Sequence, residues 1–387
     1  MNRLAAADRR VILAGVCATL LGVGLQRFAY APLLPAMVQA GWLSAGDAGL
    51  LGAANFAGYL IGAVGAPGIG RALGLRAALR AATVMAIICL LLCAWRGGPF
   101  DAGLEWYLPW RLLAGVSGGV LMVLAGPAVQ QAVAPERRAF AAGRMFIGVG
   151  LGIASGALMV PALLPFGLSA AWLALAVAAM GLTAVAWPRW PGGAPPARVA
   201  RPPLGGGIGR LLASYALSGA AIATHMGWWP DFIARGLGHG TTWGSAAWLL
   251  FGGAVMLGAV GSGWLAERIG AARAFQAIMA LQVPALLLPL LSDAVPSLVA
   301  STLLAGAATA GSSVLALTLA RDLAGTAAPG VWQACTVGWA AAQTGSGFLL
   351  AALYRATGSH LPLFAAGLVA ALGSALLAMP RRAADSK

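Results

Sequence analysis

The chain has 387 residues, of which 60% are hydrophobic and only 9% are charged. A soluble domain carries about 25% charged residues, so this composition excludes an ordinary soluble globule and predicts a polytopic membrane protein in a lipid bilayer. The net charge of +14 does not indicate nucleic-acid binding, because the arginines stand in short clusters between apolar runs and not on one face. We therefore expect no nucleic-acid partner.

Twelve apolar runs follow one another, and each is long enough for a helix that crosses a bilayer, which takes about 20 residues. They cover roughly residues 11–38, 47–67, 77–95, 104–133, 139–165, 166–187, 210–235, 243–266, 274–291, 297–320, 331–355 and 361–379. The expected fold is all-α and integral to the membrane. Its 55 glycines suit helices that pack closely through small residues.

A break rich in proline and glycine separates the sixth run from the seventh. It contains arginines but no acid, which is typical of a flexible cytoplasmic linker. The expected organisation is an N-terminal six-helix bundle (1–187), a linker (188–209) and a C-terminal six-helix bundle (210–387).

The positive charges predict the orientation of the chain. Of the 24 Lys and Arg residues, 19 fall in the termini, the linker and the loops of one side, whereas three (Arg96, Arg235 and Arg355) fall in loops of the other. Cytoplasmic loops carry the excess of Lys and Arg. We therefore expect a multi-pass protein of the inner (plasma) membrane, monomeric, with both termini in the cytoplasm.

The two halves share a short repeat. Gly62-Ala63-Val64-Gly65 recurs 196 residues later as Gly258-Ala259-Val260-Gly261, and in both copies eight residues lead on to a glycine, Gly74 or Gly270. Chance identity in a chain rich in alanine and glycine is the alternative. The matching position within runs two and eight favours duplication, and parallel six-helix repeats are a known transporter plan.

The loop after the eighth run carries a motif. It consists of Gly263, Glu267, Arg268, Gly270 and Arg273. This spacing resembles the loop signature of the major facilitator superfamily, G-x-x-x-D/E-R-x-G-x-x-R/K. The resemblance implies two pseudo-symmetric six-helix bundles and a conformational latch at these residues, in which Glu267 pairs with an arginine near a helix N-terminus.

The first copy of this motif departs from the pattern, since Pro67 and Arg71 replace its glycine and its acid. In run four, Arg111 with Gly115 resembles the superfamily's R-x-x-x-G signature.

Run one is more specific still. Gly24-Leu-Gln-Arg-Phe-Ala-Tyr30 with Pro32-Leu-Leu-Pro35 is similar to the first span of the uncharacterised YbfB/YjiJ-type transporters.

Arg27 and Arg111 stand inside apolar runs, where an arginine costs a few kcal/mol and marks a functional site. Apart from Asp231, the acids fall in loops or at the ends of runs, so neither arginine has an evident carboxylate partner. A guanidinium suits a carboxylate or phosphate. We expect both to neutralise an anionic substrate. In the alternative, backbone carbonyls, waters and hydroxyls satisfy both arginines.

Other polar residues complete the expected substrate site. Arg27 and Tyr30 share a helix face at a spacing of three residues, and Tyr30 and Asn55 are expected to orient the substrate. Gln26 and Gln343 are further candidates to line the cavity. Each of these amides could instead join two helices by a hydrogen bond.

His225 and Asp231 are the other titratable groups within the runs. His225 could carry a coupling proton near neutral pH, although a histidine packed between helices is the commoner case. Four tryptophans nearby are expected to form an interfacial belt, with a substrate cage as the alternative. They are Trp228, Trp229, Trp243 and Trp248.

Catalysis is not expected. Gly115-Val-Ser-Gly-Gly119 fits G-x-S-x-G, but a nucleophile elbow needs a strand, a turn and a helix. The glycine-rich stretches follow no strand, so no nucleotide site is implied. The four cysteines form no C-x-x-C pair, and neither a metal nor a cofactor is expected.

The sequence thus predicts a secondary transporter that moves a small solute by alternating access. A small organic anion is the expected substrate, with possible proton coupling. The alternative is a multidrug or metabolite efflux pump of the same fold. A membrane sensor or an integral membrane hydrolase would need a signalling domain or a polar triad.

Overall fold

The computed structural model describes residues 6–100, 103–133, 138–190, 192 and 205–378. Within these residues the regular structure is entirely helical. The contacts divide the chain into two compact units. Unit 1 comprises residues 1–198 and 226–252, and unit 2 comprises residues 199–225 and 253–387. The predicted linker, 188–209, lies mostly outside the described residues.

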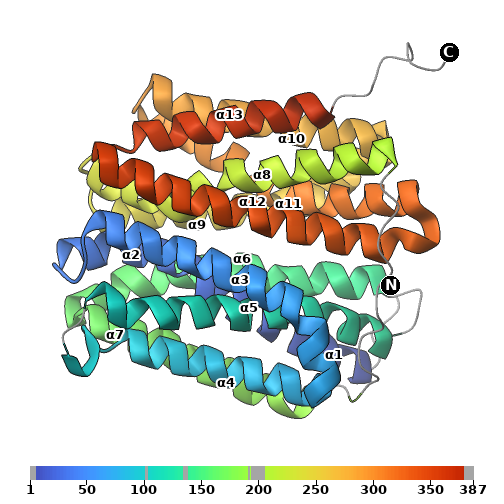
Figure 1. Ribbon diagram of the computed structural model, residues 1–387, viewed down its shortest axis with the longest axis horizontal. Coiled ribbons are helices and arrows are strands. Elements are labelled where there is room, and N and C mark those ends of the chain that lie inside the picture. Colours follow the sequence, from blue (N-terminus) through green and yellow to red (C-terminus); the bar gives the residue numbers. More distant parts are fainter. Residues whose placement is uncertain (1–5, 101–102, 134–137, 191, 193–204, 379–387) are drawn as a thin grey trace. The chain divides into compact units, whose positions relative to one another are not determined.

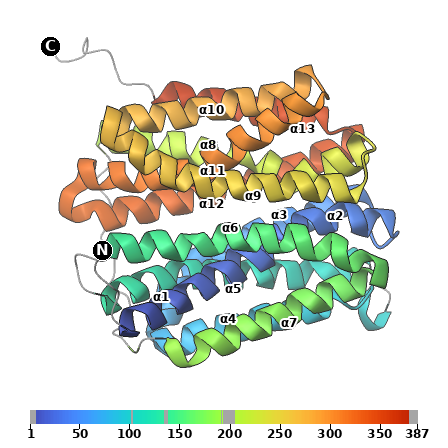
Figure 2. The same ribbon diagram turned by 180° about the vertical axis from the view of Figure 1, so that it is seen from behind.

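Unit 1 begins with one long helical segment in three parts, followed by five further helices (Figures 1 and 2). The three parts are α1 (Ala6–Thr19), the π-helix η1 (Leu20–Phe28) and α2 (Tyr30–Gln39). The five helices are α3 (Ala45–Leu73), α4 (Leu75–Cys93), α5 (Leu104–Ala132), α6 (Arg138–Leu163) and α7 (Leu168–Ala186). Short 3₁₀ turns follow α6 and α7, at Leu164–Phe166 and at η5 (Trp187–Arg189).

Six further helices complete the described chain. They are α8 (Gly206–Asp231), α9 (Thr241–Ile269), α10 (Ala271–Leu291), α11 (Val295–Ala324), α12 (Ala328–Thr357) and α13 (Leu361–Ala378). The last turns of α8 and the first half of α9 group with unit 1. Within unit 2, α10 lies against both α11 and α13.

The helices correspond in order to the twelve predicted runs, which confirms the predicted fold class. Ten of the described helical segments are long and apolar enough to cross a bilayer. The other two are α8 and α12. Both are long but more polar, because α8 carries His225 and Asp231 and α12 carries Gln333 and Gln343.

The repeat is visible in the backbone. Helices α3 and α9 both have 29 residues, and they begin at Ala45 and Thr241, which are 196 positions apart. Gly74 follows α3 with φ 81° and ψ 148°, and Gly270 follows α9 with φ 84° and ψ 149°. This left-handed conformation favours glycine over other residues. The same turn therefore occurs at the same place in both halves, as duplication predicts.

Helices α3 and α5 lie side by side in unit 1 at very short range (Figures 1 and 2). A methyl group added at Gly115 of α5 would lie 2.1 Å from the carbonyl oxygen of Asn55, and one added at Gly62 of α3 would lie 2.2 Å from the carbonyl oxygen of Val116. Gly115, four residues after Arg111, therefore allows the backbones of α3 and α5 to approach closely.

Candidate functional site

The first membrane segment widens at η1. In this stretch the backbone forms π-helical turns, and the N–H of Ala29 donates to the carbonyl oxygen of Gly24, five residues earlier, at 2.9 Å. Just before it, the hydroxyl of Thr19 donates to the carbonyl of Met145 on α6 at 2.6 Å. π-Helical turns are rare in proteins, and those that do occur are often found at functional sites. Gln26 and Arg27 lie within this turn.

Helix α6 supports η1 through glycines. A methyl group added at Gly152 would lie 2.2 Å from the Cα of Gly24, and one added at Gly156 would lie 2.7 Å from the Cα of Ala29. Contacts this short admit no side chain beyond hydrogen without a backbone shift. The glycines of run five thus fix the position of the turn that carries Arg27.

Arg27 is buried among aromatic rings and keeps 6% of its surface exposed. Its guanidinium carbon lies 4.5 Å from the ring centre of Phe56, 4.9 Å from that of Tyr59 and 5.7 Å from that of Phe28. Cations are attracted to ring faces at these distances. The rings come from α3 and from η1 itself, so Arg27 is a positive charge in an otherwise apolar setting.

Arg111 on α5 lies in a different environment. Its Nη1 donates to the carbonyl oxygen of Gln26 at 2.9 Å, and its guanidinium carbon lies 4.2 Å from the ring centre of Tyr30 and 5.9 Å from that of Trp172. Only 1% of Arg111 is exposed. Among the described residues, no carboxylate lies within ion-pair distance of it. Arg111 therefore braces the widened turn.

Two amides share this brace. The side-chain nitrogen of Asn55 donates to the carbonyl oxygen of Arg111 at 3.1 Å, and that of Gln26 donates to the carbonyl oxygen of Ala86. The amide oxygens of Gln26 and Asn55 and the Nε of Arg111 are buried and have no hydrogen-bond partner within the described chain. Buried polar atoms are normally satisfied. These three atoms offer two acceptors and one donor to a polar group or a water.

The structure brings together five of the six predicted substrate residues. Gln26, Arg27, Tyr30, Asn55 and Arg111 all belong to η1, α2, α3 and α5 of unit 1. The sixth, Gln343, is buried on α12 of unit 2.

Arg27 and Tyr30 both contact α3, through different residues. The Tyr30 ring lies under Arg111, and the Tyr30 hydroxyl donates to the carbonyl oxygen of Ala48 at 2.7 Å. The face that the two residues are predicted to share stays a prediction.

His225 and Asp231 both lie at buried positions, but in different units. Nε2 of His225 lies 3.0 Å from the hydroxyl of Ser301, which itself donates to the carbonyl oxygen of Ala285. The hydroxyl hydrogen is thus engaged, so Nε2 carries the proton and donates it to Ser301. His225 of α8 thus contacts Ser301 of α11, and its coupling role stays a prediction.

Asp231 at the end of α8 forms an ion pair with Arg235, four residues later. Its carboxylate is fully buried, and 18% of the arginine side chain is exposed. The charge of Asp231 is therefore compensated within its own turn of helix.

The expected tryptophan belt is wrong for three of its four members. Trp228, Trp229 and Trp248 are at most 2% exposed, whereas Trp243 is 60% exposed. Within unit 1, Nε1 of Trp248 donates to the carbonyl oxygen of Phe28 at 2.9 Å, next to Arg27. Sequence analysis missed this role, because a tryptophan in an apolar run gives no indication of its distant partner.

The second loop motif spans the end of α9 and the start of α10. Glu267, Arg268, Gly270 and Arg273 are exposed, and the guanidinium carbon of Arg268 lies 4.0 Å from the ring centre of Trp264. The latch remains a prediction, because no ion pair of Glu267 occurs among the described residues. The G-x-S-x-G stretch lies within α5, where Ser117 donates to the carbonyl oxygen of Ala114.

Comparison with solved structures finds the same fold at low sequence identity. The partially occluded, inward-open xylose transporter XylE from E. coli superposes with a TM-score of 0.73 and 14% identity over 97% of each chain. A D-xylose-proton symporter gives 0.72 and 16% over 94% of this chain and 96% of that one. An auto-inhibited POT family peptide transporter gives 0.73 and 12% over 99% and 98%.

Comparison with curated protein sequences gives no match. The family described as uncharacterised MFS-type transporter YbfB, in contrast, matches residues 19–378. This range contains every predicted substrate residue, in agreement with the resemblance seen in run one. The chain therefore belongs to the YbfB family of MFS-type transporters.

Proposed function

We propose that the protein is a secondary active transporter that moves a small organic anion across the inner membrane by alternating access. The observation that carries this proposal is Arg27, a positive charge on a widened turn inside the first membrane segment. Ionisable residues at membrane depth are costly and mark substrate or ion pathways. The fold and the family support secondary transport, in which two helix bundles alternately expose one central site.

The difference between the two arginines narrows the substrate class. Arg111 already binds the carbonyl of Gln26 and is 1% exposed, so it positions the site and does not meet the substrate directly. Arg27 is then the one cation that contacts the anion, and aromatic rings surround it. A single cation among rings favours a monocarboxylate with an apolar part over a compact polyanion.

The remaining polar residues have secondary roles in this proposal. Gln26 and Asn55 offer their free amide oxygens to a hydroxyl or water near the anion, and Tyr30 holds Arg111 in place. The exposed loop motif at Gly263–Arg273 acts as the latch between conformers.

Proton coupling is the second part of the proposal. One solved structure of the same fold is named as a proton symporter, and at 16% identity it lends only the fold. Here His225 is the proposed carrier, because the charge of Asp231 is already compensated by Arg235. Replacement of His225 by Gln is expected to abolish the pH dependence of uptake into proteoliposomes.

The first test is a thermal-shift screen of the purified protein at two pH values, with benzoate, succinate, inorganic phosphate and ethidium as probes. A ligand that binds the folded state raises the melting temperature. We expect benzoate to stabilise the protein most. Stabilisation by ethidium alone would favour the efflux pump, which is the alternative function.

The second test is counterflow of radiolabelled benzoate in proteoliposomes. Arg27→Ala is expected to reduce the rate at least tenfold, since the only substrate-facing cation is lost, while Arg27→Lys retains part of it. The control is Arg96→Gln, which removes an exposed arginine whose contact is the carbonyl of Gly41. Unchanged counterflow in a folded Arg27→Ala variant would overturn the proposal.

A further inference from the structure

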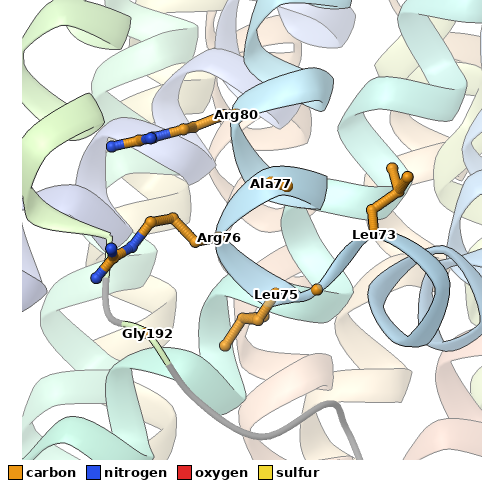
Figure 3. A pocket seen from close by; sticks show the side chains of 7 residues that line it. Leu73, Leu75, Arg76, Ala77, Arg80 and Gly192 are labelled. Carbon is orange, nitrogen blue, oxygen red and sulfur yellow. The ribbon is translucent and has the colours of Figure 1, made fainter.

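A surface pocket of about 480 Å³ opens at the N-terminal end of α4, remote from the site around Arg27 in the sequence. Figure 3 shows the guanidinium groups of Arg76 and Arg80 extending to the same side of this helix. The pocket is lined by Leu73, Gly74, Leu75, Arg76, Ala77, Arg80 and Gly192.

Both arginines are held in position by the segment that follows α7. Nε of Arg76 donates to the carbonyl oxygen of Trp190 at 3.0 Å, and Nη2 of Arg80 donates to that of Trp187 at 2.9 Å. The Arg80 guanidinium carbon also lies 4.6 Å from the Trp187 ring centre. A guanidinium has five N–H donors, so each arginine keeps donors for another acceptor. The two cations are thus oriented in advance.

No carboxylate of the described residues balances the charge of this cluster. Among the described residues, no carboxylate lies within ion-pair distance of Arg76 or Arg80. The N-terminus of α4 adds partial positive charge at the same place. In addition, Arg71 lies in the last turn of α3, at the position where the second half of the repeat has Glu267. The pocket therefore favours an anion.

The second half of the repeat lacks the pocket residues. The positions 196 residues after Arg76 and Arg80 are Ala272 and Gln276, although the turn at Gly270 has the same backbone conformation as that at Gly74. The arginine pair is thus not required by the turn itself. It is a property of the first half alone.

The surroundings of the pocket indicate its depth in the membrane. Leu73 is 55% exposed and Trp187 is 38% exposed, so apolar surface adjoins the charged pocket. Tryptophan is enriched at the level of the lipid headgroups. The excess of Lys and Arg in the loops of one side of the membrane predicts that this end of α4 faces the cytoplasm.

We propose that this pocket binds the phosphate group of an anionic phospholipid from the cytoplasmic leaflet. Arg76 and Arg80 donate hydrogen bonds to the phosphate oxygens, and the acyl chains lie along Leu73 and Trp187. Basic pockets between membrane helices on the cytoplasmic side bind such headgroups. Free phosphate shares the charged chemistry but lacks the apolar part.

The test is a thermal-shift titration of the full-length protein in a neutral detergent, with phosphatidylglycerol, phosphatidylcholine and inorganic phosphate as separate probes. Phosphatidylglycerol is expected to raise the melting temperature by about 3 °C or more, and the other two to raise it much less. Arg76→Gln/Arg80→Gln is expected to weaken the apparent affinity for phosphatidylglycerol roughly 30-fold, at about fivefold per arginine near the membrane surface.

Two further variants make the result decisive. Arg10→Gln/Arg321→Gln removes two exposed arginines of the same predicted side and should retain the full shift. Arg76→Lys/Arg80→Lys keeps the charge and should restore part of it. Equal stabilisation by inorganic phosphate would overturn the lipid assignment. The same loss in both glutamine double variants, or no shift in the wild type, would overturn the pocket.

Discussion

Arg27 and Arg111 are both buried cations inside apolar runs of unit 1, yet their guanidinium groups contact different kinds of partner. Arg111 donates to the carbonyl oxygen of Gln26 and lies over the ring of Tyr30, so its charge serves the backbone of the widened turn. Arg27 lies against the rings of Phe56 and Tyr59 and keeps a small exposed surface. Two residues that look equivalent in the sequence thus have different surroundings: a backbone carbonyl for Arg111 and aromatic rings for Arg27, the proposed substrate contact.

The largest expected difference between the two arginines is in stability. Arg111→Leu leaves the Gln26 carbonyl without its 2.9 Å donor and empties the space over the Tyr30 ring, at an expected cost of about 3–5 kcal/mol in the free energy of unfolding. Arg27→Leu removes a desolvated charge from an aromatic setting and is expected to cost less than about 1 kcal/mol. Unfolding of the purified variants in mixed micelles measures both. Equal losses would remove the distinction.

The glycine contact beneath η1 gives the next largest effect. Gly152→Ala places a methyl group 2.2 Å from the Cα of Gly24, and overpacking of this kind costs about 1–3 kcal/mol. Because the turn that carries Arg27 must move, transport should fall as well. Gly181→Ala in α7 is the matched control, since nothing lies within 4 Å of its added methyl group. It is expected to be neutral or slightly stabilising. A neutral Gly152→Ala variant would show that α6 does not position the turn.

A substitution of Asn55 tests whether the hydrogen-bond network around η1 includes residues other than Arg111. Asn55→Ala removes the donor to the carbonyl oxygen of Arg111 and is expected to cost about 1–2 kcal/mol in the free energy of unfolding. In the double variant with Arg111→Leu, the loss of unfolding free energy should be smaller than the sum of the two single losses, because the residues share one network. Full additivity would contradict a shared brace.

The smallest effect concerns two tyrosines. Tyr30→Phe keeps the ring beneath Arg111 but removes the hydrogen bond to the carbonyl oxygen of Ala48, at an expected cost of about 0.5–1 kcal/mol. Tyr59→Phe on the Arg27 side keeps the ring and has no such bond to lose, so its unfolding free energy should not change. A larger loss at Tyr59 than at Tyr30 would reverse the comparison.

Much of the fold could be predicted from the sequence because a bilayer allows few structures. The length and hydropathy of the runs lead directly to helices, and the repeat around Gly62 and Gly258 indicates a duplication, with which the matching turns at Gly74 and Gly270 agree. These features depend on local composition and on spacing along the chain. The residues of the candidate site could be named for the same reason, since polar residues are scarce within the runs.

The surroundings of those residues could not be predicted. The sequence of Leu20–Phe28 does not distinguish a π-turn from an α-turn, so the widened turn that carries Gln26 and Arg27 could not be predicted. Arg111 donates to a backbone carbonyl 85 positions away. Every residue has such a carbonyl, so the sequence does not indicate which one an arginine will bind. In the same way, the sequence does not distinguish Arg76 and Arg80 from other loop arginines. Only the structure shows that they donate to the carbonyls of Trp190 and Trp187.

The widened turn at η1 has a geometric consequence for whatever follows it. An α-helix advances about 100° and 1.5 Å per residue, so a single residue absorbed from the π-turn into regular helix would swing α2 by about that angle. Phe28 and Tyr30 would then point in new directions while α1 stayed anchored through Thr19. The π-helical part of the first membrane segment has more residues per turn than an α-helix. The directions of its aromatic side chains therefore depend on whether these residues are in π-helical or α-helical turns.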